Sequence, residues 1–171
     1  MEIREATDAD WPQIYPFFAE IVAAGETYAY PDGLSSSQAR GLWMQDHVVV
    51  AVDGPVVLGS AKMGPNRPGR GAHVGTASFM VSPATQGRGV GRALGEYCVA
   101  WHRREGFRAI QFNAVVETNT VAVRLWQALG FHIIGTVPEA FDSRTHGLVG
   151  LHVMHLSLKP AGAPAMYPAR S

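Results

Sequence analysis

The sequence has little that would suit an extracellular, membrane-bound or nucleic-acid-binding protein. It has one cysteine, Cys98, so no disulfide can form within the chain. Its 14 basic and 14 acidic side chains cancel, which leaves no overall field to attract nucleic acid or an anionic membrane. No apolar run reaches the length of a membrane-spanning helix, and the N-terminus has no charged segment followed by an apolar one. We expect a cytoplasmic protein whose partners include neither nucleic acid nor a membrane.

Two nucleotide-binding motifs are also missing. A Walker loop ends in Gly-Lys followed by Ser or Thr, and the chain contains no Gly-Lys pair. A dinucleotide fingerprint has glycines at its first, third and sixth positions. Counted from Gly87 the sixth position is Arg92, and counted from Gly89 it is Leu94. Both motifs are therefore excluded for the glycine-rich segment at 87–91.

That segment still has the character of an anion-binding loop. It follows an alternating strand pattern at 76–81 and leads into a helix predicted over 89–104. Glycines let the backbone approach a ligand closely, and the first amides of a helix have no partner within the helix. The alternative is a flexible turn. We expect a phosphate group on the loop, held by its amides and by two arginines, the residues being Gly87, Arg88, Gly89, Val90, Gly91 and Arg92.

The remaining patterns alternate between strand and helix. Cys98 lies on the apolar face of the helix at 89–104, so we expect it in the core rather than as a nucleophile. These patterns predict a mixed sheet flanked by helices in a single domain over 1–158, and an extended or disordered tail over 159–171. Strands are predicted at 2–6, 47–52, 56–63, 76–81, 109–115, 132–137 and 148–156, and helices from Trp11 and over 35–44, 89–104 and 119–129.

Two segments together resemble one known family. The first is Gln86-x-x-Gly89-x-Gly91, and the second is Asn119-x-x-Ala122 followed by Gly130-Phe131. This pair, in this order and at this interval, resembles the GCN5-related N-acetyltransferases (GNAT). The resemblance covers about residues 1–158. It implies an α/β fold with a mixed, mostly antiparallel sheet, in which acyl-CoA lies between two parallel strands that splay apart, here 76–81 and 109–115.

The resemblance also implies the cofactor and the residues that hold it. Acetyl-CoA would be the acyl donor, with its pyrophosphate on the loop and its pantetheine arm near Asn119. A backbone N–H at the end of the strand at 76–81, that of Val81 or Met80, would polarise the thioester carbonyl. No metal is required for direct transfer. The implied cofactor-binding residues are Phe79, Met80, Val81, Gln86, Gly87, Arg88, Gly89, Val90, Gly91, Arg92, Asn119 and Ala122.

The groups that move protons are less well defined by sequence. Glu26 and His73 are the candidate general bases, and Glu117 is better explained as a charge favourable to the helix that follows it. Relatives commonly carry a tyrosine, which protonates the leaving thiol, at the position of Trp126. An indole is not a practical acid, so water, Tyr97 or Tyr28 would have to serve, or the thiolate would leave unassisted.

The acceptor is expected to be a small-molecule amine, an amino acid or a xenobiotic. Its candidate binding residues are two tyrosines of an aromatic segment after the first helix and three residues farther along the chain: Tyr28, Tyr30, Asn113, Phe141 and His152. His152 and His155 point to opposite faces of a strand, which argues against a metal site. Family members are often dimers, so the resemblance also suggests a homodimer. The alternative function is a non-catalytic acyl-CoA sensor.

Overall fold

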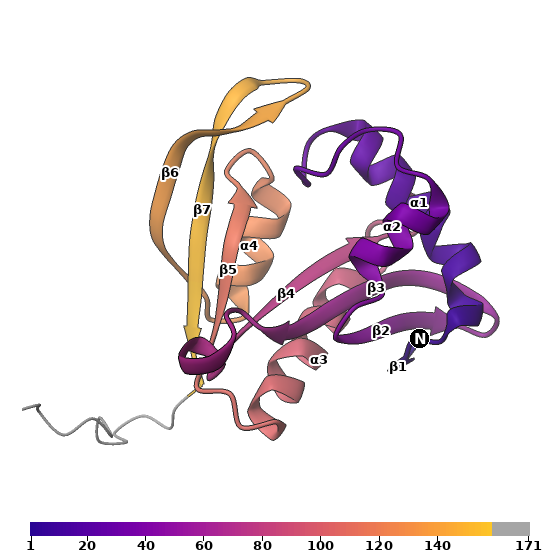
Figure 1. The fold of residues 1–171 in the computed structure, drawn as a ribbon, viewed down its shortest axis with the longest axis horizontal. Coiled ribbons are helices and arrows are strands. Elements are labelled where there is room, and N and C mark those ends of the chain that lie inside the picture. Colours follow the sequence, from indigo (N-terminus) through magenta and orange to yellow (C-terminus); the bar gives the residue numbers. More distant parts are fainter. Residues whose placement is uncertain (159–171) are drawn as a thin grey trace, which may run out of the picture.

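The computed structural model describes residues 1–158 and shows one seven-stranded sheet with helices on both faces (Figure 1). The strand order is β1-β2-β3-β4-β5-β7-β6, and only β4 and β5 run parallel. The tail expected at 159–171 lies outside the described residues. The strands are β1 (Glu2–Glu5), β2 (His47–Asp53), β3 (Val56–Pro65), β4 (Val74–Val81), β5 (Ala109–Val116), β6 (His132–Ser143) and β7 (Gly147–Ser157).

Four α-helices connect the strands, and their ends follow local sequence signals. They are α1 (Trp11–Ala24), α2 (Ser36–Trp43), α3 (Val90–Arg104) and α4 (Thr120–Ala128). Ser35 and Gln38 form a capping box at the start of α2, and Gly25 ends α1 in the left-handed conformation. Within residues 1–158 no helix combines the length and apolarity needed to cross a membrane.

Two hydrophobic clusters lie on opposite faces of the sheet. One joins α1 and α2 to β2 and to Met80 of β4. The other joins α3 and α4 to the opposite face and includes Cys98, which is only 1% exposed. Burial raises the pKa of the Cys98 thiol, so it stays protonated. The prediction that Cys98 belongs to the core is confirmed.

The parallel strands β4 and β5 are paired at one end only. Val74 lies opposite Ala109 and Gly75 opposite Ile110, and no further pairs follow. Beyond this point the strands diverge, as Figure 1 shows. The splayed parallel pair predicted from the resemblance is therefore present. On the side of α3 and α4, the space is filled by stacked and tilted aromatic rings of Phe79, Phe112, Trp126 and Phe131.

The end of β6 was predicted wrongly. The sequence indicates a strand that stops at Val137 and a loop through Phe141, but the strand continues to Ser143. Its pairing with β7 is interrupted between Val137 and Phe141, and Glu139 has a positive φ of 50°. Because β6 is the edge strand, Pro138 breaks no essential ladder bond, and the irregularity lets the strand pass through it.

Candidate active site

The glycine loop lies at the N-terminus of α3. Gly87 and Gly89 have φ values of 79° and 76°, and no atom lies within 4 Å of where a Cβ would stand on either. Ala93 N donates the first helical hydrogen bond, to Gly89 O at 3.0 Å. The amides of the preceding turn, at 90–92, therefore point out of the helix end, where the helix dipole also favours an anion.

The two arginines of the loop form ion pairs at its rim. Arg88 lies 2.7 Å from Asp53 in the β2–β3 hairpin, and Arg92 lies 3.3 Å from Glu96 on the next turn of α3. All four side chains are about half exposed. Exposed pairs of this kind contribute little stability, so both guanidinium groups can turn toward a phosphate at small cost.

The free edge of β4 forms the second part of the site. In an antiparallel pair, residues alternate between bonding their partner strand and facing away from it. Ser82 N donates to Leu58 O at 2.9 Å, so Met80, two residues earlier, also bonds toward β3. Phe79 and Val81 then turn their N–H and C=O groups toward the gap that β5 leaves open.

The loop, the end of β4 and α4 meet at Gly91. A Cβ on Gly91 would stand 3.5 Å from Leu125 of α4 and 3.7 Å from Val81 of β4. At the start of α4, the Asn119 side chain accepts a hydrogen bond from Ala122 N at 3.1 Å and so caps the helix. Residues 79–81, the loop and α4, which are separate in the sequence, thus border one gap.

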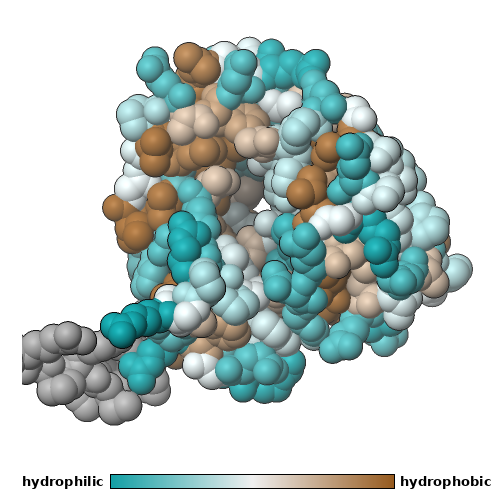
Figure 2. Space-filling model, viewed as in Figure 1, coloured by the Kyte–Doolittle hydropathy of each residue, from teal (hydrophilic) through white to brown (hydrophobic). Residues whose placement is uncertain are grey.

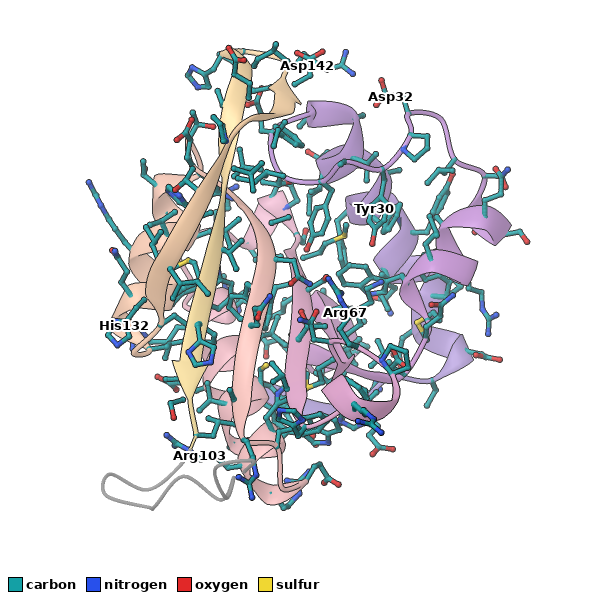
Figure 3. All side chains as sticks on the ribbon, turned by 60° about the vertical axis from the view of Figure 1, so that its left-hand side comes forward. Tyr30, Asp32, Arg67, Arg103, His132 and Asp142 are labelled. Atoms are coloured by element: carbon teal, nitrogen blue, oxygen red, sulfur yellow. The ribbon has the colours of Figure 1, made fainter. Side chains whose placement is uncertain are left out.

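A cavity of about 400 Å³ lies on the other side of this gap. It separates the connection between α1 and α2 from the β6–β7 hairpin, and Figure 2 shows the surface hollowed between these two parts of the molecule. Three predicted acceptor residues line it, Tyr28, Tyr30 and Phe141. Three charged residues that the sequence analysis did not identify also line it: Asp32, Asp142 and Arg144. In Figure 3, Tyr30 and Asp32 lie on one side and Asp142 on the hairpin.

Glu26 joins the two walls of the cavity. Its carboxylate accepts hydrogen bonds from Ser143 Oγ at 2.6 Å, Thr145 Oγ1 at 2.7 Å and Thr145 N at 2.8 Å. The hydroxyl of Ser143 and then the groups of Thr145 lower the pKa of Glu26. Arg144 Nη2 lies 2.8 Å from Asp32 Oδ2, and this ion pair also joins the two walls. We call these residues, Glu26, Asp32, Ser143, Arg144 and Thr145, the hairpin bridge.

Other predicted residues lie away from the cavity. His73 is exposed, immediately before β4, and its C=O accepts a hydrogen bond from Arg108 N at 2.8 Å. Phe79 is six positions later in the chain, a distance of about 20 Å along an extended strand. His152 pairs with Thr136 at 2.8 Å. It faces away from Phe141, because its neighbour Leu151 packs on the Phe141 side.

Asn113 lies on β5, beyond the residues that pair with β4. Its side chain donates to Asn66 Oδ1 at 2.6 Å and accepts from Gln111 at 2.9 Å. These amides connect β5 with the segment that follows β3. Asn113 thus borders the gap without lining the cavity. Within the described part of the chain, no three His, Cys, Asp or Glu residues are grouped so that they could hold a metal ion.

The splayed parallel strands and the helix N-terminus beside them are the arrangement that the resemblance to the GNAT family implies, and the cavity lies on the opposite side. Comparison with known proteins agrees: residues 6–131 match the acetyltransferase (GNAT) family. The chain belongs to this family, and it is an acyltransferase of the N-acetyltransferase class.

Three similar proteins illustrate the relationship. A GCN5-related N-acetyltransferase from Kribbella flavida is 66% identical with a TM-score of 0.89, over 92% of this chain and 97% of that one. The putative acetyltransferase yncA from Salmonella typhimurium, solved with its cofactor acetyl-CoA, is 26% identical with a TM-score of 0.81, over 98% and 99%. N-acetyltransferase aca1 of Schizosaccharomyces pombe is 36% identical over 90 residues, 53% of this chain and 43% of aca1. The match thus spans less than half of aca1.

Proposed function

We propose that this protein transfers the acetyl group of acetyl-CoA directly to the amine of a small molecule, such as an amino acid or a xenobiotic. The observation that carries the proposal is the contact of Tyr28 with both sides of the site. Its ring lines the cavity, and its hydroxyl bonds the backbone of Phe79 at the open edge of β4. An acceptor in the cavity would therefore lie next to a donor in the gap.

The donor would follow the border of the gap. The pyrophosphate is assigned to the amides of the loop from Gln86 to Gly91, with Arg88 and Arg92 nearby. The thioester is assigned to the edge of β4, and the pantetheine arm to the space beside Asn119 and Ala122. The similarity of the fold to that of yncA, which was solved with acetyl-CoA, supports acetyl-CoA as the donor.

The reaction needs one bond to form and one to break. The amine nitrogen attacks the thioester carbon, the carbonyl oxygen becomes an oxyanion, and the C–S bond then breaks to release the thiolate of CoA. A backbone N–H aimed at the oxyanion stabilises it. The alternation along β4 supports Val81 over Met80 for this role, because the Met80 N–H points toward β3 and the Val81 N–H toward the gap.

The amine acceptor must lose a proton during the reaction, and among residues 1–158 no side chain near the cavity is well suited to remove it. A general base has to lie within hydrogen-bond reach of the amine, which favours Glu26 near the cavity over His73 at the far end of β4. Glu26 is nevertheless a weak base, because its pKa is lowered by the hairpin. We assign it mainly to holding the cavity together, and we assign removal of the amine proton to water in the cavity.

The leaving thiolate also lacks an obvious acid. Trp126 is packed among aromatic rings, and Tyr97 lies beside His47 on the outer part of α3. Burial raises the pKa of Tyr28, so its hydroxyl holds its proton too strongly to serve well. The thiolate of CoA is a good leaving group near neutral pH, and we assign its protonation to solvent.

The cavity limits the size of the acceptor. Its volume of about 400 Å³ falls in the range of small-molecule sites. The hairpin bridge joins its two walls, which favours a small acceptor over an extended chain. Aromatic walls and the carboxylates of Asp32 and Asp142 suit a small amine with an apolar part.

The test combines calorimetric titration with acetyl-CoA and a free-thiol assay against a panel of amines and amino acids. We expect binding, and thiol release that depends on the amine. Binding without release for any amine would indicate the sensor function instead. No binding of acetyl-CoA would contradict the proposal. A folded Gly91→Glu variant serves as the control that cannot hold the pyrophosphate.

A further inference from the structure

One hydroxyl occupies the place where β4 loses its strand partner. Tyr28 Oη accepts a hydrogen bond from Phe79 N at 2.9 Å and donates one to Phe79 O at 2.6 Å. A parallel neighbour would satisfy these two groups, but β5 pairs with β4 only at Val74 and Gly75. Tyr28 comes from the connection after α1, 51 residues earlier in the chain. A single side chain therefore makes the hydrogen bonds that a neighbouring strand would make to Phe79.

The surroundings hold this hydroxyl firmly. The Tyr28 ring stacks on Tyr30 with a centroid distance of 5.4 Å and an interplanar angle of 1°. It also meets Trp43 edge to face at 6.2 Å. Trp43 is fully buried and bonds Ser60 Oγ at 3.0 Å. Because only a protonated phenol can accept from an N–H and donate to a C=O at once, the pair of bonds requires neutral Tyr28.

The hydrogen bonds to Phe79 leave the Val81 N–H as the next backbone donor that faces the gap. Phe79 and Val81 face the same way, because they are two residues apart on one strand. With the Phe79 N–H already bonded to Tyr28, the Val81 N–H is left as the donor available to a carbonyl oxygen. An unpaired Phe79 N–H would compete for that oxygen, and a looser β4 edge would blur its position. A shift of about 1 Å in such a donor is enough to slow catalysis strongly.

We propose that Tyr28 is a positioning residue that fixes the edge of β4, so that the Val81 N–H alone donates a hydrogen bond to the thioester carbonyl of acetyl-CoA. This inference rests on the proposed function. Tyr28 also lines the acceptor cavity, so the same ring sets the distance between the acceptor and the donor carbonyl.

The variant test is Tyr28→Phe, with Tyr15→Phe as the matched control. Both changes remove one tyrosine hydroxyl that donates to a backbone carbonyl in the same hydrophobic cluster, but the Tyr15 hydroxyl bonds Leu34 O and does not contact β4. For Tyr28→Phe we expect kcat to fall about tenfold or more, the order expected for a weakened oxyanion donor. For Tyr15→Phe we expect kcat to stay within about threefold.

Ligand binding separates positioning from general loosening of the fold. Acetyl-CoA has the thioester carbonyl and CoA lacks it, so only acetyl-CoA should sense the Val81 N–H. We expect Tyr28→Phe to reduce the preference for acetyl-CoA over CoA while the affinity for CoA is unchanged. Equal losses for both ligands, or an unchanged kcat, would overturn the inference. Failure of the wild-type protein to bind acetyl-CoA would instead refute the proposed function.

A measurement on the wild-type protein does not depend on any variant folding. In amide NMR spectra we expect the Phe79 amide to exchange slowly with solvent, and the Val81 amide to shift with acetyl-CoA more than with CoA. If instead the Phe79 amide shifts more with acetyl-CoA than with CoA, the thioester carbonyl of acetyl-CoA displaces the Tyr28 hydroxyl from that amide. Tyr28 would then be a competitor for the donor site, and the positioning role would be wrong.

Discussion

The two ends of β4 use glycine for opposite reasons. At the paired end, Gly75 lies directly under the ring of His102, and a Cβ there would collide with ring atoms Cδ2 and Nε2. Beyond the open end, in the loop that leads from β4 into α3, Gly89 has a φ of 76° and no atom within 4 Å of a Cβ position. Packing requires the first glycine, and backbone conformation requires the second. The paired end is thus built as protein core, and the open end leaves room for a ligand.

The largest effect is expected at the open end. Gly91→Glu should weaken acetyl-CoA binding at least about 100-fold, because a carboxylate would stand where phosphates are proposed to bind. Gly91→Ala is the control, since its Cβ would make only ordinary contacts with Leu125 and Val81. Titration calorimetry on folded variants measures both. Equal affinity of Gly91→Glu and the wild-type protein would show that the loop holds no phosphate.

At the paired end, the expected loss is in stability. Gly75→Ala should lower the free energy of unfolding by about 2 kcal/mol, because His102 is buried and has no room to move aside. Urea denaturation measures the loss. In a His102→Ala background the same change should cost clearly less, since the collision is gone. An equal cost in both backgrounds would mean that His102 does not set the requirement for glycine.

The paired end should also respond to pH. His102 Nδ1 lies 2.8 Å from Cys98 O and so carries the proton, while Nε2 is buried without a partner among the described residues. Burial lowers the pKa of His102. Below about pH 6.5 the histidine is therefore protonated in the unfolded chain but stays neutral in the folded one. The free energy of unfolding then falls as the pH drops, by up to about 1.4 kcal/mol per pH unit.

Urea denaturation at pH 7.5 and 5.5 checks this, with His102→Leu as the comparison. The variant should lose less stability between the two pH values than the wild-type protein does, because its other titrating groups are the same. Identical pH dependence of the two proteins would show that His102 becomes protonated without cost.

The smallest effect is expected at the hairpin bridge. Glu26→Gln keeps the shape but weakens three hydrogen bonds to a carboxylate, so the KM of the acceptor should rise about fivefold with acetyl-CoA affinity unchanged. Because the pKa of Glu26 is lowered below its ordinary value of 4.5, the bridge is intact at neutral pH and is lost only in acid. A fall in kcat with unchanged acceptor KM would support Glu26 as the general base instead.

Much of the fold could be read from local patterns, since capping residues and apolar periodicity act over one or two turns. Ser35 and Asn119 are caps at the predicted helix starts, and Cys98 is in the core as expected. The continuation of β6 through Pro138 could not be read in this way. A proline ordinarily stops a strand, and only the edge position of β6 in the sheet makes it harmless.

The candidate site divides in the same manner. The glycine loop and the Asn119 segment are each short contiguous motifs, so the sequence by itself determined the family, and it also predicted the residues that we propose for the donor side of the site. The acceptor side depends on contacts between segments more than 100 residues apart, such as Glu26 with Thr145 and Asp32 with Arg144. Only tertiary structure decided these contacts, along with the bonds of Tyr28 to Phe79. No local pattern encodes which side chain completes an open strand edge, because any donor and acceptor brought there by the fold would satisfy it.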